Sequence, residues 1–194
     1  MSGPDSLQAR KQQLRRLVRA RRPDEAACAA ESRALCEGLL RTEIWQAART
    51  VAAYMPLPHE ADVRPLLMAA LREGKTLLLP RVAEGRMAFL RVEELSALQK
   101  DDYGILTPPA GAAALASEAI DLMLVPVEAL DGRLRRLGKG GGWYDRVLAA
   151  GRPCRAAGVL LRHQWVREVP CGAWDQRLDA AVDADGLHLP EPTA

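Results

Sequence analysis

The first forty residues carry apolar side chains at helical spacing. Between about Ser6 and Arg22 these side chains share one face, at Leu7, Leu14, Leu17 and Val18. Basic side chains crowd the remaining surface of this segment. Pro23 ends the predicted helix, and the acids at 24 and 25 open a second helix that runs to about residue 40. The sequence therefore predicts a basic amphipathic helix followed by a second helix.

Beyond residue 50 the pattern changes to short apolar runs of strand length. These runs lie at 50–55, 76–79, 87–92, 120–126 and 156–161. Helical patterns, such as the one from Arg64 to Arg72, separate some of them. This alternation predicts an α/β fold, a single domain with a mainly parallel sheet flanked by helices. The length of 194 residues fits one domain spanning 1–194, in which we expect 1–5 and 188–194 to be loose ends.

Composition and charge narrow the class of protein. Lys and Arg number 27 and Asp and Glu number 25, so the net charge of +2 does not by itself indicate nucleic acid or a membrane surface as a partner. No apolar run approaches the roughly 18 to 20 residues of a membrane span, and the N-terminus has no stretch resembling a secretory signal. The four cysteines and three histidines are scattered, which favours reduced thiols and disfavours a zinc site. We expect a cytoplasmic protein.

Residues 69–76, AALREGKT, nearly match the P-loop pattern of nucleotide-binding proteins. A P-loop leaves a strand and opens a helix, so that the helix N-terminus meets the phosphate. Here residues 64–73 read as helix and the LLLP run after them reads as strand, which is the reverse order. Gly74 is therefore better explained as the left-handed residue that ends a helix.

The segment RLGKGGGWYDR, residues 136–146, is the stronger candidate for a phosphate site. Its four glycines allow a tight turn whose N–H groups converge on an anion. Arg135, Arg136 and Lys139 add positive charge, and a helix predicted at 143–150 begins directly after the turn. Trp143 and Tyr144 suggest a planar ligand stacked nearby. The alternatives are a flexible surface loop with solvated charges and two aromatic side chains packed in the core.

Further charged side chains could complete such a site. Lys11 and Arg15 lie one turn apart on the basic helix, where a solvent-facing role is the alternative. An RNA contact is less favoured, because this helix carries no aromatic side chain. Asp145 follows the glycine turn and could bind magnesium together with phosphate oxygens, or could simply stabilise the helix N-terminus. A second metal-binding acid could be Asp175 or either of the acids at 179 and 183, and spacing alone does not choose among them.

Four segments of the chain resemble the 5-formyltetrahydrofolate cyclo-ligases, also called 5,10-methenyltetrahydrofolate synthetases. They are KQQLR at 11–15, AAYMPLPHEADVRPLL at 52–67, the glycine segment, and WDQRLDAAVD at 174–183. The resemblance implies a fold like that of ribose-phosphate isomerase and coenzyme A transferase domains. It also implies the ATP-dependent closure of 5-formyltetrahydrofolate to 5,10-methenyltetrahydrofolate, with release of ADP and phosphate. In this family the formyl oxygen attacks the γ-phosphate without a covalent enzyme nucleophile, so the protein supplies positioning and charge.

The resemblance also implies roles for individual residues. It assigns ATP binding to Lys11, Arg15, Arg136, Gly138, Lys139, Gly140, Gly141, Gly142, Trp143, Tyr144 and Asp145. It assigns catalysis to Arg136, Lys139 and Tyr144, magnesium binding to Asp145 and Asp175, and folate binding to Met55, Glu60, Tyr103 and Tyr144.

Two positions depart from the pattern of this family. Trp143 stands where tyrosine is usual, and Lys139 stands where relatives carry tyrosine or arginine. Lysine keeps the charge of arginine but lacks its planar fork.

We expect a monomer that binds neither nucleic acid nor membrane. The alternative function is a non-catalytic phosphate-ligand or RNA-binding protein of the same fold.

Overall fold

The computed structural model describes residues 5–102, 104–153 and 155–190, and an eight-stranded sheet runs through this part of the chain. In spatial order its strands are β12 (Gly186–His188), β11 (Ala180–Asp183), β10 (Arg155–Val159), β7 (Leu122–Pro126), β1 (Thr50–Ala52), β2 (Thr76–Ala83), β3 (Arg86–Val92) and β6 (Ala114–Leu115). The five strands from β11 to β2 are parallel neighbours, whereas β12, β3 and β6 pair antiparallel at the edges. The predicted mainly parallel α/β sheet is confirmed.

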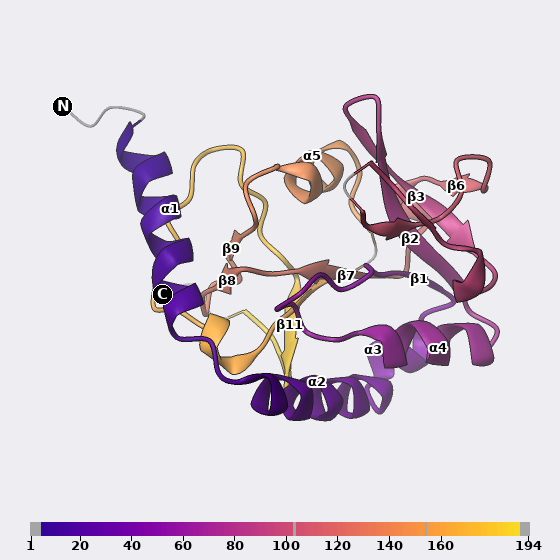
Figure 1. Cartoon of the computed structure of the whole chain (residues 1–194), viewed down its shortest axis with the longest axis horizontal. Helices are drawn as coiled ribbons and strands as arrows, with labels where there is room; N and C mark the ends of the chain where they lie inside the picture. The colour runs from indigo at the N-terminus through magenta and orange to yellow at the C-terminus, as the bar shows by residue number, and fades with distance from the viewer. Residues whose placement is uncertain (1–4, 103, 154, 191–194) are drawn as a thin grey trace.

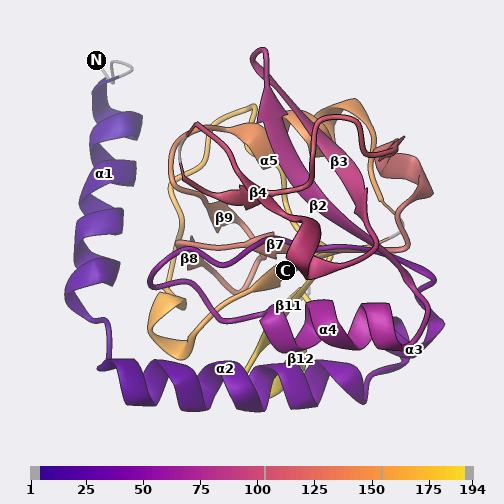
Figure 2. The same cartoon turned by 45° about the vertical axis from the view of Figure 1, so that its right-hand side comes forward.

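Helices cover both faces of this sheet (Figure 1). They are α1 (Asp5–Ala20), α2 (Glu25–Leu40), α3 (Glu43–Ala47), α4 (Arg64–Arg72) and α5 (Trp143–Ala150). The row of α2, α3 and α4 lies on one face and α5 lies on the other, while α1 stands at one side of the molecule (Figures 1 and 2). Three-residue 3-10 helices lie at Leu95–Ala97, Ser117–Ala119 and Arg162–Gln164. Two small strand pairs lie outside the main sheet: β4 (Gln99–Lys100) with β5 (Leu106–Thr107), and β8 (Ala129–Leu130) with β9 (Arg136–Leu137).

The long helices begin and end close to the predicted residues because their signals are local. The Asp24 carboxylate accepts a hydrogen bond from Ala27 N at 2.8 Å and caps α2. α4 spans the predicted residues and is followed by Gly74, whose φ of 71° is left-handed. Lys75 Nζ then donates to the carbonyls of Trp45 and Ala48 at 2.9 and 2.7 Å. The near-match to a P-loop is therefore a helix end whose lysine binds backbone carbonyls.

Apolar side chains fill both faces of the sheet. The larger cluster packs α2, α3 and α4 against the sheet around Trp45, and the other packs α5 around Met123 and Leu148. A third, small cluster docks α1 through Val18. Leu17 does not share this packing and is 48% exposed, because α1 contacts the body over a narrow stripe.

Two of the residues predicted to lie in loose ends belong to regular structure. Asp5 already belongs to α1, and His188 closes β12, where it pairs with Ala181. The remaining predicted end residues, 1–4 and 191–194, lie outside the described part of the chain. No helix within the described ranges combines the length and the apolar character needed to span a bilayer.

Candidate active site

A cavity of about 360 Å³ opens where the carboxyl ends of β1, β2 and β7 meet the glycine turn and α1. This edge of a parallel sheet is where ligands of open α/β proteins bind, and the volume is in the range of small-molecule sites. One side of the cavity is polar and is lined by Gly138–Gly142, α1 and the start of α5. The other side is mostly apolar and is lined by Met55, Leu57, Val82, Met87, Ile105 and Leu106.

The glycine turn adopts backbone conformations that favour glycine. Gly140 and Gly142 have φ values of 114° and 64°, which L side chains rarely adopt. Gly142 caps α5 without a side chain, so the first N–H groups of that helix border the turn. A Cβ at Gly138 would collide with the Arg136 guanidinium. Glycine at position 138 therefore makes room for a cation, and the glycines at 140 and 142 shape the backbone.

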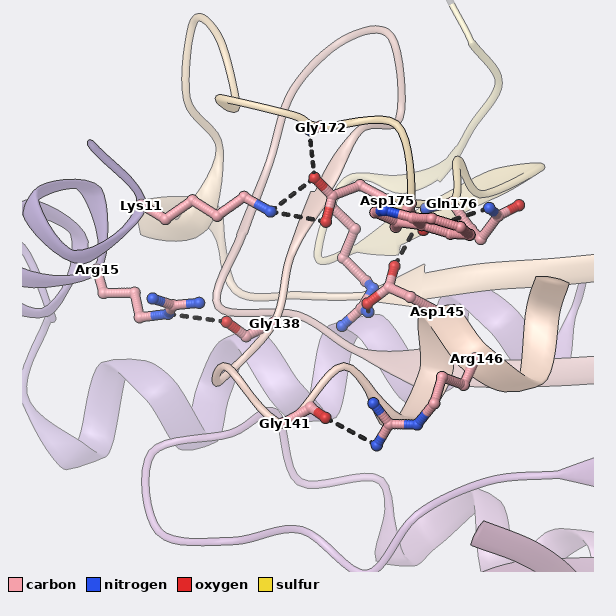
Figure 3. A network of polar contacts seen from close by, with 11 residues as sticks. Lys11, Arg15, Gly138, Gly141, Asp145, Arg146, Gly172, Asp175 and Gln176 are labelled. Atoms are coloured by element: carbon pink, nitrogen blue, oxygen red, sulfur yellow. Dashed lines mark hydrogen bonds and ion pairs between the residues drawn. The ribbon is translucent and has the colours of Figure 1, made fainter. Parts of the chain in front are cut away.

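Two cations extend from α1 into the site, Lys11 toward Asp175 and Arg15 toward the glycine turn (Figure 3). Lys11 Nζ lies 2.7 and 2.6 Å from the two carboxylate oxygens of Asp175. Arg15 Nε donates to the carbonyl oxygen of Gly138 at 2.9 Å. Among the described residues Arg15 forms no ion pair, and partial burial lowers its pKa, partly opposed by the charge of Glu128. Arg15 therefore presents a charge to the cavity that no carboxylate within the described ranges neutralises directly.

The two predicted magnesium acids meet at the same cavity from distant parts of the chain. Asp145, on the first turn of α5, accepts from Arg136 Nη2 at 2.8 Å and from Gln176 N at 3.1 Å. Asp175 accepts from Gly172 N at 2.6 Å in addition to its contact with Lys11. Both carboxylates are thus held in place and neutralised by cations of the site.

The other two acids that spacing left open lie elsewhere. Asp179 accepts from Ala156 N at 2.7 Å and from Arg152 at 2.9 Å. Asp183 is buried and contacts Trp165 Nε1 and His188 Nε2, both at 2.7 Å. Within the described ranges no group of three or more His, Cys, Asp or Glu side chains could hold a metal. A metal at this site would therefore need ligand oxygens besides the two carboxylates, as magnesium does with nucleotides.

Glu60 and Lys139 join the two sides of the cavity. Lys139 Nζ, on the glycine turn, lies 2.8 Å from Glu60 Oε1. Glu60 Oε2 accepts from Leu57 N at 2.8 Å, and the Glu60 side chain is only 7% exposed. Burial, helped by the charge of Glu60, raises the pKa of the Tyr144 hydroxyl above its ordinary value. The Tyr144 hydroxyl therefore stays protonated at neutral pH.

The two aromatic residues after the glycines have different surroundings. The Tyr144 ring packs against Phe89 at a centroid distance of 6.4 Å and lies 5.7 Å from the Arg136 guanidinium. The Trp143 ring is stacked by Arg146 at 4.3 Å, and Arg146 also donates to Gly141 O at 2.9 Å. Tyr144 thus belongs partly to the core and partly to the cavity, whereas Trp143 lines the cavity under a guanidinium.

The cavity brings together most of the residues that the sequence predicts for the site. Every predicted ATP-binding and magnesium-binding residue lines it, as do the predicted folate-binding residues Met55, Glu60 and Tyr144. The predicted folate-binding residue Tyr103 lies outside the described residues. Four further polar residues line the cavity without having been predicted from the sequence, namely Gln8, Asp101, Thr107 and Glu128. The helical spacing of Gln8 to Lys11 could have indicated the first, but nothing in the sequence indicated that Glu128 is buried beside the site.

Buried polar atoms in the site fit a charged ligand. Arg136 Nε is buried without a hydrogen-bond partner among the described residues, although the Arg136 guanidinium contacts Asp145. Glu128 is 6% exposed and accepts from Arg19 Nε at 2.6 Å. The polar side therefore holds a buried guanidinium N–H that no described residue satisfies and that an oxygen of a charged ligand could accept from.

Comparisons with known proteins give one consistent result. The family model described as 5-formyltetrahydrofolate cyclo-ligase family matches residues 6–184. A 5-formyltetrahydrofolate cyclo-ligase of Escherichia coli K12 is 32% identical over 141 residues, which cover 70% of this chain and 78% of that protein. A probable 5-formyltetrahydrofolate cyclo-ligase of Schizosaccharomyces pombe is 30% identical over 169 residues, which cover 78% and 83%. The solved structure of Aquifex aeolicus 5,10-methenyltetrahydrofolate synthetase is similar with a TM-score of 0.84 and 28% identity, covering 95% of this chain and 94% of that one.

Proposed function

The chain belongs to the 5-formyltetrahydrofolate cyclo-ligase family, and from this premise we propose how its cavity brings ATP and the folate together. The chain is an enzyme that converts 5-formyltetrahydrofolate to 5,10-methenyltetrahydrofolate, and its dependence on ATP follows from the family. The assignment of individual residues to each ligand is our proposal.

The ATP phosphates bind in the glycine turn. The supporting observation is that Lys11, Arg15, Arg136 and Lys139 line the same cavity as residues 138–142, and that Arg15 contacts this turn directly. At an effective dielectric constant of about 20, unit charges 4 Å apart interact by roughly 4 kcal/mol, so several cations together can hold a triphosphate. The first turn of α5 adds backbone donors to the same place.

Asp145 and Asp175 would hold a magnesium ion at this site, together with phosphate oxygens of the nucleotide. Both acids now contact cations, Asp145 through Arg136 and Asp175 through Lys11. With ligands bound, Lys11 and Arg136 would contact phosphate oxygens, and Asp145 and Asp175 would be free to hold the metal. Magnesium would neutralise charge that develops on the transferred phosphoryl group.

The folate binds on the apolar side of the cavity, with its formyl group directed toward the glycine turn. The formyl oxygen then bonds to the γ-phosphorus, and the bond from that phosphorus to ADP breaks. N10 of the folate next attacks the formyl carbon and gives up its proton to solvent, and the carbon–oxygen bond breaks as phosphate leaves. Arg136 and Lys139 stabilise the oxygens of the transferred group, and the protonated Tyr144 hydroxyl serves as a hydrogen-bond donor at the junction.

An assay that follows the absorbance of the product tests this function. Purified protein with ATP, magnesium and 5-formyltetrahydrofolate should produce the near-ultraviolet absorbance of the methenyl product. Omission of ATP, or removal of magnesium with a chelator, should abolish the signal. Folded protein that gives no signal with all components present would contradict the proposal.

Three further proposals concern the oligomeric state, the location and the partners of the enzyme. We propose a monomer, which is supported by a cavity that one chain lines on both sides. We propose a cytoplasmic location, which is supported by the free thiols of Cys28, Cys36 and Cys171. We also propose that the enzyme binds no nucleic acid, because Lys11 and Arg15 face the cavity.

A further inference from the structure

The contact between Lys139 and Glu60 crosses from the polar side of the cavity to the apolar side. Lys139 lies in the glycine turn, and Glu60 lies in the loop that follows β1. Their charged groups are 2.8 Å apart, with the lysine 43% exposed and the carboxylate 7% exposed. This ion pair therefore occupies the place where the two ligands of the proposed function must meet.

Lys139 differs from the other cations of the cavity in the position of its partner. Lys11 contacts Asp175, Arg136 contacts Asp145, and both of these acids belong to the polar side. The partner of Lys139 is instead a carboxylate on the side that we assign to the folate. A buried carboxylate that loses its cation is strongly destabilised, because its charge is left without compensation. Loss of the contact between Glu60 and Lys139 is therefore unfavourable unless another hydrogen-bond donor replaces the lysine.

A reduced folate supplies such donors, because its pterin ring carries N–H and amino groups. We propose that Lys139 couples the two binding events: the folate replaces Lys139 at Glu60, and the released ammonium turns to the γ-phosphate. This inference rests on the proposed function and adds to it a coupling between folate binding and ATP binding. Without folate the lysine is withheld from ATP, and with folate bound the lysine is available at the reacting phosphate. The two ligands therefore bind with positive cooperativity.

Calorimetric titration of a non-hydrolysable ATP analogue with magnesium tests this coupling. For the wild-type protein, saturating 5-formyltetrahydrofolate should tighten binding of the analogue at least about fivefold, within the usual range of coupling between sites. In Lys139→Met the same addition should change the affinity by less than about twofold. That variant should also bind folate alone at least as tightly as wild type does, because no lysine has to leave Glu60.

A second variant tests the other partner. Glu60→Gln keeps a hydrogen-bonding side chain but removes the charge that retains the lysine, so the analogue alone should bind more tightly than it binds to wild type. The matched control is Lys100→Met, at an exposed position on β4 that does not line the cavity, and it should keep the wild-type coupling. Melting temperatures check that each variant is folded.

The outcomes separate this inference from the proposed function. Full coupling in Lys139→Met, or weaker binding of the analogue by Glu60→Gln, would overturn the coupling role. A wild-type protein that binds both ligands independently would also overturn it and leave the function intact. A wild-type protein that binds neither ligand would instead refute the assignment of the cavity.

Discussion

The Arg136 guanidinium lies so close to Gly138 that a larger residue at position 138 should displace it. Gly138 is not one of the glycines with left-handed φ, so alanine is compatible with its backbone. A Cβ there would lie 3.3 Å from Arg136 Cζ and nearer still to Nη1. Ordinary carbon contacts lie at about 3.5 to 4.0 Å, so the guanidinium must move by about 1 Å. The substitution Gly138→Ala therefore tests the placement of one cation without removing it.

The expected loss follows from the contact that this movement breaks. Arg136 Nη2 donates to Asp145 at 2.8 Å, and a hydrogen bond to a charged group contributes about 1.5 to 3 kcal/mol. If the same group holds phosphate in the transition state, kcat/KM for ATP should fall roughly 10-fold to 150-fold. Steady-state kinetics with varied ATP at saturating folate measures this loss.

The control is Gly111→Ala, at another glycine without left-handed φ, where a Cβ meets nothing within 4 Å. This variant should keep wild-type kinetics. The reasoning is refuted if Gly138→Ala, folded and with an unchanged melting temperature, also keeps kcat/KM within about twofold of wild type.

Three other substitutions follow from the contacts described above. Lys75→Ala should lower the free energy of unfolding, measured in urea, by about 1 to 3 kcal/mol and should leave turnover unchanged. The reason is that the Lys75 ammonium contacts two backbone carbonyls and Glu73 and does not face the cavity. Turnover lost in a stable variant would restore the P-loop interpretation. Tyr144→Phe should make the alkaline loss of stability shallower in melts across pH, because the pKa raised by burial keeps the native hydroxyl protonated while the unfolded chain ionises above pH about 10. An identical pH dependence in both proteins would show that this hydroxyl is not shielded. Arg19→Ala should destabilise the protein more than Glu128→Leu in the same urea measurement, because only the first leaves a buried carboxylate unpaired, and the reverse order would contradict this.

The sequence predicted those features whose causes are local. The bounds of α2 and α4 follow from a capping aspartate and a terminal glycine, and these signals act within a few residues. The glycine turn was equally visible, because a dense group of glycines directly before an amphipathic helix favours a tight backbone turn. The sheet class followed from the order of apolar runs.

The pairings within the site could not be predicted from local pattern. Lys11 and Asp175 are 164 positions apart, and only the docking of α1 beside the loop before β11 brings them together. The choice of Asp175 over Asp179 also depends on tertiary structure, since Asp179 binds the backbone of β10 instead. The resemblance to the family supplied that choice, and of these two acids Asp175 is the one that lines the cavity.

In the proposed function, phosphate and metal meet where the glycine turn leads into α5. A crystal structure with manganese in place of magnesium and a non-hydrolysable ATP analogue tests it most directly, because anomalous scattering locates the metal. We expect a metal peak between Asp145 and Asp175, with the triphosphate against residues 138–142. A nucleotide bound elsewhere, with both acids still held by Lys11 and Arg136, would contradict it.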